Sequence, residues 1–149
     1  MDLKQHVQKE LHAAMKAGDT VKRETLRTLL SAIMNAEVEK KEALNAEDYV
    51  AVVQREAKKR RESIEAFEAG GRLGRAAVET QELHILQSYL PQQLTREALQ
   101  EVVRNVIEAL SAQGTPNLGS VMGRVMGQVK GQADGNVVRQ VVTELLQDA

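Results

Sequence analysis

The stretch LGSVMGRVMGQVKGQADGNVV, residues 118–138, combines a helical apolar pattern with a glycine at every fourth position. Its Val and Met residues recur three and four positions apart, which is the spacing of one buried helix face. Gly119, Gly123 and Gly127 lie together on the flank of that face. Because each glycine inside a helix costs about 1 kcal/mol relative to alanine, this bare stripe needs an explanation.

Two compatible explanations fit the stripe. Small residues allow a neighbouring helix of the same protein to pack closely. Alternatively, a bare backbone allows a bulky external partner, such as an RNA sugar-phosphate strand, to approach closely. The observation that separates them is whether Gly123 and Gly127 are covered by the protein's own helices or accessible to solvent.

The stripe leads into KGQADG, residues 130–135, which predicts a tight corner between two helices. We expect Lys130 in the last turn of the first helix, where a cation suits the helix dipole. Gly131 is expected to end that helix in the left-handed conformation, and Asp134 to cap the next one.

Positive charge is concentrated at this corner. Residues 113–143 contain three cations, Arg124, Lys130 and Arg139, against one acid, Asp134, which gives a local net charge of +2. Because Asp134 would repel an anion, we expect phosphate contact nearer Lys130 and Arg124.

Every other segment long enough to judge also has a helical period. Paired valines near the C-terminus recur at helical spacing, and a lone strand would have no partner. We therefore predict an all-α protein, with about four helices in residues 1–90 and a small three-helix domain in residues 94–149, separated by YLPQQLT at 89–95. The boundary signals are Gly18, Asp19, the capping-box sequence NAED at 45–48, Gly70–Gly71, a fourth helix running to Leu90 before Pro91, Thr95 and Asn117.

Composition excludes several classes of protein. The chain has 149 residues, 42% apolar and 28% charged, with a net charge of −1, which suits a folded protein. It has no cysteine, so no disulfide, thiolate nucleophile or zinc-finger spacing is expected. Three aromatic residues argue against a base-stacking platform. We expect no membrane span, no secretory signal in MDLKQHVQKE, and a cytoplasmic location.

A second basic surface is a candidate on the predicted third helix, which contains REAKKRRESIEAFEAGGR at 55–72. Its consecutive cations fan around the helix, and acids at i,i+4 offsets favour a solvated, salt-bridged face. A docking surface for RNA or an acidic partner is the alternative. The candidate residues are Arg55, Lys58, Lys59, Arg60 and Arg61, and the expected ion pairs are Glu56–Arg60, Lys58–Glu62 and Arg61–Glu65.

The sequence supplies no catalytic constellation. His6 and His12 do not align on one helix face, and His84 is isolated, so no metal site is predicted. There is no Gly-rich phosphate loop after a strand and no Gly-x-Ser-x-Gly elbow. We predict no catalytic residue, metal or cofactor.

Several segments of the chain match one known family in order and spacing. They are AAMKAGD at 13–19, RETLRTLLSAIMNAEVE at 23–39, KKRRESIEAFEAGGR at 58–72, Glu79, ELHILQSYLP at 82–91, MGRVMGQVKGQADGNVV at 122–138, and Leu145–Leu146. Through them the chain resembles the GatB/YqeY family over nearly its full length. One departure lies at RLGRAAVE, 72–79, where family members usually carry an acid after the first Arg and no Gly at the position of Gly74, which leaves the start of the fourth helix open.

The resemblance implies that the last three helices are similar to the tail domain of the GatB component of the aspartyl/glutamyl-tRNA amidotransferase. In that enzyme the tail domain contacts the outer corner of the tRNA, and the chemistry occurs elsewhere. Similar modules are also appended to a glutaminyl-tRNA synthetase in some bacteria. The family's tail motif falls on Gly123, Gly127, Lys130, Gly131, Ala133 and Asp134.

We therefore expect an accessory tRNA-binding module, non-catalytic on its own, that works with tRNA and with an aminoacyl-tRNA synthetase or amidotransferase. Its expected RNA-binding residues are the tail-motif positions together with Arg124 and Arg139. Two alternatives stay open. One is a component of a glutamine-dependent amidotransferase, a carbon–nitrogen ligase with glutamine as amido donor. The other is a helical protein–protein interaction module.

Overall fold

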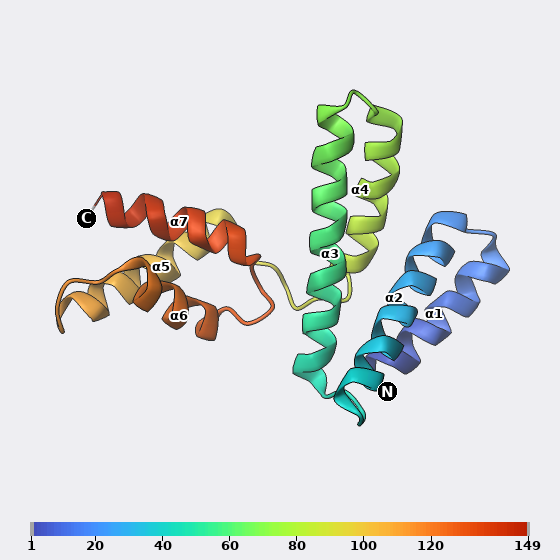
Figure 1. Ribbon diagram of the computed structural model, residues 1–149, viewed down its shortest axis with the longest axis horizontal. Coiled ribbons are helices and arrows are strands. Elements are labelled where there is room, and N and C mark those ends of the chain that lie inside the picture. The colour runs from blue at the N-terminus through green and yellow to red at the C-terminus, as the bar shows by residue number, and fades with distance from the viewer. Residues whose placement is uncertain (1, 149) are drawn as a thin grey trace. The chain divides into compact units, whose positions relative to one another are not determined.

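The structure is a computed structural model that describes residues 2–148. Within those residues it contains seven α-helices and no strand, which confirms the all-α prediction (Figure 1). No helix among them is long and apolar enough to cross a membrane. The helices are α1 (Leu3–Ala17), α2 (Thr20–Lys40), α3 (Ala46–Ala69), α4 (Leu73–Gln87), α5 (Arg96–Ser111), α6 (Leu118–Gln128) and α7 (Gly135–Gln147).

Contacts within the chain divide it into two compact units. Unit 1 is Met1–Leu90 and contains α1 to α4, whereas unit 2 is Pro91–Ala149 and contains α5 to α7. Each unit has its own cluster of buried apolar side chains.

Helix starts follow the local sequence signals. The predicted capping box at 45–48 is confirmed: Asn45 Oδ1 accepts a hydrogen bond from the Asp48 N–H at 2.9 Å, and Asp48 Oδ2 accepts one from the Asn45 N–H at 2.9 Å. The Asp19 side chain caps α2. Gly18 ends α1 in the left-handed conformation with φ of 70°, where a residue with a Cβ would be strained.

Unit 1 consists of two antiparallel helix pairs, α1 with α2 and α3 with α4 (Figure 1). The first part of α3 also packs against α2, and α3 packs far more extensively against α4. His6 contacts Tyr89 edge to face, with 5.7 Å between ring centroids, and burial raises the pKa of Tyr89 to about 12. The largest fully buried side chains of the unit are Val7, Leu26, Leu29, Ile33, Val53 and Leu86.

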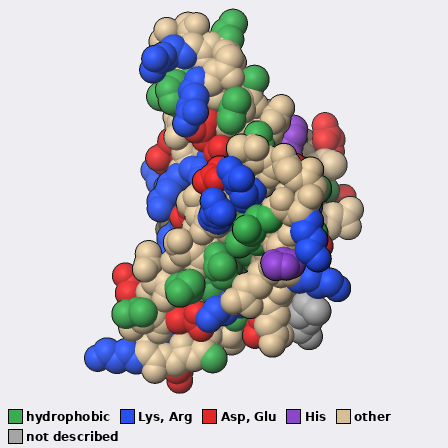
Figure 2. Space-filling view, turned by 90° about the vertical axis from the view of Figure 1, so that its right-hand side faces the viewer, with side chains coloured by type: hydrophobic (Ala, Val, Ile, Leu, Met, Phe, Trp, Pro, Cys, Tyr) green, Lys and Arg blue, Asp and Glu red, His purple; other side chains and the backbone are tan. Residues whose placement is uncertain are grey.

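Figure 2 shows the side of the molecule on which α1 and α2 lie. Lysines and arginines are interleaved with acids there, around a group of hydrophobic side chains. The large hydrophobic side chains exposed on these two helices are Met15, Met34 and Val38. A mixed surface of this kind is typical of folded proteins, which expose single apolar side chains routinely.

The predicted ion pairs on the basic run are wrong. Arg60 Nε lies 2.8 Å from Oε2 of Glu82 and 3.5 Å from Oε2 of Glu79, both on α4, because α4 covers that side of α3. Glu56 instead pairs with Lys59, at 3.0 Å. Within residues 2–148 the Lys58–Glu62 and Arg61–Glu65 pairs do not form either.

The acids beside Arg60 are withdrawn from solvent. Glu79 is only 6% exposed. Burial raises the pKa of the Glu82 carboxyl, and the neighbouring Glu79 carboxyl raises it further. This contact fixes α4 against α3 through charge as well as through apolar packing.

The fourth helix ends at Gln87 and not at the predicted Leu90. Its C-cap N–H, from Ser88, is shared among several carbonyls, and the Tyr89 and Leu90 N–H groups bond only three residues back. This tightening is expected because the position before a proline, here Pro91, is driven away from helical geometry. At the other end, a Cβ at Gly74 would meet no atom within 4 Å, so this departure from the family pattern leaves the helix start at Leu73 intact.

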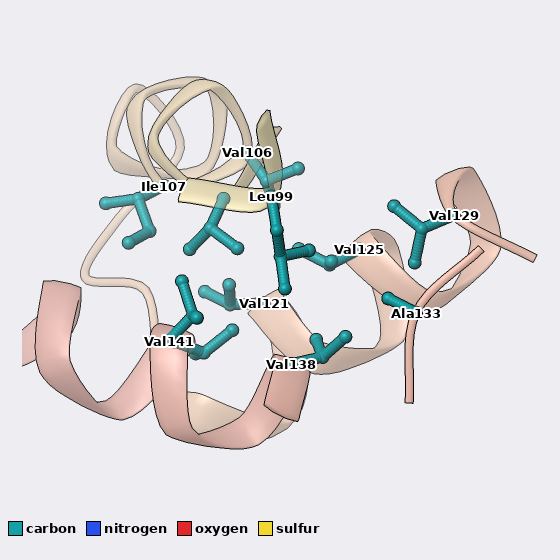
Figure 3. Packing of buried hydrophobic residues seen from close by; sticks show 11 residues of the cluster. Leu99, Val106, Ile107, Val121, Val125, Val129, Ala133, Val138 and Val141 are labelled. Carbon is teal, nitrogen blue, oxygen red and sulfur yellow. The ribbon is translucent and has the colours of Figure 1, made fainter. Parts of the chain in front are cut away.

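Unit 2 is built around aliphatic side chains that point toward one another from α5, α6 and α7 (Figure 3). The C-terminal valines predicted to be helical are helical, and Val138, Val141 and Val142 are all fully buried. Thr95 caps α5 as predicted, accepting from the Ala98 N–H at 3.1 Å.

We predict that the capping box of α3 gives unit 1 a pH-dependent contribution to stability. Lys40 donates a hydrogen bond to Asp48. This bond, together with the one from the Asn45 N–H, holds the pKa of the Asp48 carboxyl below its ordinary 3.8. A depressed folded pKa stabilises above the unfolded pKa, and the effect is lost as pH falls through the folded value. Asp48→Asn should therefore lower the melting temperature at pH 7 and have little effect below the folded pKa. Thermal unfolding followed by circular dichroism, at pH 7 and at a pH below the folded pKa of Asp48, measures this. An equal loss of melting temperature at the two pH values would contradict the prediction.

Candidate functional site

The first part of the candidate site is α6, whose start is fixed by its own sequence. Asn117 Oδ1 accepts a hydrogen bond from the Ser120 N–H at 2.9 Å, and Ser120 Oγ accepts one from the Asn117 N–H at 3.2 Å. Val121 and Val125 point into the core of unit 2 and are fully buried. Their burial sets the rotation of the helix and turns the glycine stripe away from the core.

The glycine stripe is open. Gly123 and Gly127 are exposed, and a Cβ added at either would meet no atom within 4 Å. At Gly119 the nearest atom would be Oδ1 of Asn117, at 3.4 Å. Close packing by a neighbouring helix of unit 2 is therefore the wrong explanation for Gly123 and Gly127. These glycines lower helix stability, and no close packing contact at their positions offsets that loss.

The corner after α6 differs in detail from the prediction. The helix ends at Gln128 with Val129 as its cap, so Lys130 lies in the turn and not in the last helical turn. This shift follows from the Gln132 N–H, which bonds the Val129 carbonyl at 2.7 Å and so begins a new turn. Gly131 has φ of 74°, which confirms the expected left-handed conformation.

The turn is held by the segment that precedes α5. Gln93 Nε2 donates to the Gly131 carbonyl at 2.7 Å, and the Leu94 N–H donates to the Gln132 carbonyl at 2.9 Å. Sequence reasoning missed Gln93, because its partner is 38 residues away. Its only sequence signal is its place in the boundary stretch YLPQQLT at 89–95. These two bonds fix the backbone on which Lys130 is presented.

The eight predicted RNA-binding residues differ in exposure. Five are exposed on α6, the turn and α7: Gly123, Arg124, Gly127, Lys130 and Arg139. Gly131 and Ala133 are buried and shape the turn, with Ala133 joining the core of unit 2. Asp134 occupies the N-cap position of α7, but its side chain accepts no capping hydrogen bond.

The second basic surface is smaller than predicted. Arg55, Lys58 and Lys59 are exposed on α3. The side chain of Arg60 is only 17% exposed, because it is enclosed by acids of α4, so it does not belong to this surface. Among residues 2–148 no group of three or more His, Asp or Glu side chains is placed to hold a metal ion.

We predict that the stripe glycines weaken the fold of unit 2. Replacing Gly123 or Gly127 with Ala adds a side chain into open space within a helix, so each variant should gain about 1 kcal/mol of stability. Denaturant unfolding measures the gain. Gly131→Ala is the matched control and should destabilise, since its φ is 74°. Loss of stability in either stripe variant would contradict the open-surface interpretation.

No curated protein matches this sequence. The family model described as Yqey-like protein matches residues 4–146. The match spans both units and reaches from the first turn of α1 to the last turn of α7. The chain therefore belongs to the YqeY-like protein family.

Proposed function

We propose that this protein is an accessory tRNA-binding module for tRNA-dependent amidation or aminoacylation in the cytoplasm, without catalytic activity of its own. The proposed RNA surface is formed by the exposed stripe of α6, the Lys130 turn and the start of α7. The observation that carries the proposal is the open backbone at Gly123 and Gly127.

An uncovered glycine stripe suits a bulky, anionic partner. Without Cβ atoms, the helix backbone is accessible at its surface, so a sugar-phosphate edge can approach more closely than on an ordinary helix. Arg124 on α6 and Lys130 beyond it supply positive charge, and α6 contains no acid. Phosphate contacts of this kind position a nucleic acid without reading its sequence.

Family membership supports the comparison with the amidotransferase tail domain. Unit 2 has three helices, and its turn carries the tail motif around Lys130. In this proposal an aminoacyl-tRNA synthetase or amidotransferase supplies the chemistry, and this chain supplies additional binding contacts to the tRNA.

We predict that charge reversal at the corner weakens tRNA binding. Filter binding with purified total tRNA at low salt measures affinity for the wild type and for Arg124→Glu, Lys130→Glu. With about two to four phosphate contacts, log affinity should fall with log salt at about 0.7 to 0.9 per contact. The double variant should bind more weakly and show a shallower slope. Arg104→Glu, an exposed change on α5, is the control and should have a smaller effect. Equal binding by wild type and the double variant would exclude this corner as the RNA surface.

A second prediction tests the bare backbone itself. Gly127→Leu adds bulk to the stripe without touching the core, so it should weaken tRNA binding about tenfold, or ~1.4 kcal/mol. The fold should be retained, because leucine is a better helix former than glycine. Gln128→Leu places the same side chain at the neighbouring exposed position and is the matched control. If both variants bind like the wild type, the glycines are not a contact surface. A protein partner retained after nuclease treatment, without tRNA binding, would favour the interaction-module alternative.

A further inference from the structure

A groove in unit 1 is lined by residues of α2 and α3. These two helices diverge from their connecting turn (Figure 1). The volume of the groove is about 160 Å³. Each helix contributes residues at i, i+3, i+4 and i+7, which is one continuous face. The α3 helix packs more extensively against α4 than against α2. The apolar part of the groove lining consists of Ala32, Ala36 and Val52.

Opposite charges face this groove without meeting. Glu39 on α2 and Arg55 on α3 both line it, yet within residues 2–148 neither forms an ion pair or a side-chain hydrogen bond. Opposite charges so placed are each satisfied only by solvent. A molecule carrying both an ammonium and a carboxylate could pair with both walls at once.

Two further charged residues, Glu56 and Lys59, line the groove, and one of them is buried. Glu56 is 5% exposed, and it pairs with Lys59, one helical turn away, whose side chain is 66% exposed. A buried carboxylate is costly unless it is well paired. A carboxylate has room for further donors beyond the single one that Lys59 supplies. An ammonium group in the groove would provide them.

We propose that the α2–α3 groove binds a small zwitterion, a free α-amino acid. The ammonium pairs with Glu39 and Glu56, and the carboxylate pairs with the Arg55 guanidinium, whose planar fork suits a carboxylate. An apolar side chain lies along Ala32, Ala36 and Val52. The inference is independent of tRNA binding, because the groove lies in unit 1.

The test uses the full-length, nitrogen-15-labelled protein and amide chemical shifts. L-leucine is the probe, compared with N-acetyl-L-leucine, which lacks the ammonium, and L-leucinamide, which lacks the carboxylate. We expect saturable shifts at Ala36, Val52 and Arg55 with L-leucine, and at least about tenfold weaker binding of both blocked forms, since each loses a charge-assisted contact. Absence of saturable shifts with L-leucine overturns the proposal. Equal binding of L-leucinamide also overturns it, because the groove would then recognise a cation alone.

Variants locate the binding charges. Glu39→Gln and Arg55→Gln should each weaken L-leucine binding about tenfold. Lys58→Gln and Glu62→Gln change residues of α3 that do not line the groove, and they should bind like the wild type. Circular dichroism checks that each variant is folded. If L-leucine binds Glu39→Gln and Arg55→Gln as it binds the controls, the proposed site is wrong.

Discussion

Two hydrogen bonds hold the turn on which the proposed RNA surface depends. Gln93 and Leu94 donate to the carbonyls of Gly131 and Gln132, and they join the segment before α5 to the connection between α6 and α7. They restrain the short turn of residues 129–134 between α6 and α7. One donor is the Gln93 side chain and the other is the Leu94 backbone, and together they fix the backbone on which Lys130 is presented. The exposed cations of unit 2 therefore lie on backbone that is held in place.

Local signals in the sequence predicted most of the helices, whereas contacts between distant residues were missed. The caps at Asn45, Thr95 and Asn117 can be predicted because each acts on the N–H three residues ahead. The buried valines of α7 follow from their spacing. Arg60 was misassigned because its partners lie on the next helix, a choice that i,i+4 rules cannot anticipate.

The candidate site, like the fold, could be predicted only in part from the sequence. Its exposed cations and glycines were identified from the sequence, because charge and missing side chains are local properties. Whether the stripe is open could only be answered by the fold, since covered and uncovered glycines have the same spacing. The groove of unit 1 was missed entirely. Its two walls come from different helices, and Ala32 or Ala36 alone carries no signal of a cavity.

The charges of unit 1 respond to acid in opposite directions. Asp48 has a lowered pKa, so acid removes its stabilising interaction with Lys40. Glu82 has a raised pKa, chiefly through burial, so its penalty is present when it is ionised and is relieved as the pH falls through its folded value. The two effects fall in successive pH ranges, because the pKa of Glu82 lies above its ordinary 4.5 and that of Asp48 lies below its ordinary 3.8. Mild acidification therefore relieves the penalty at Glu82 while Asp48 still holds Lys40, and the Asp48 interaction is lost only in stronger acid. This order of protonation arises from where the two carboxylates are placed and not from the number of acids in the unit.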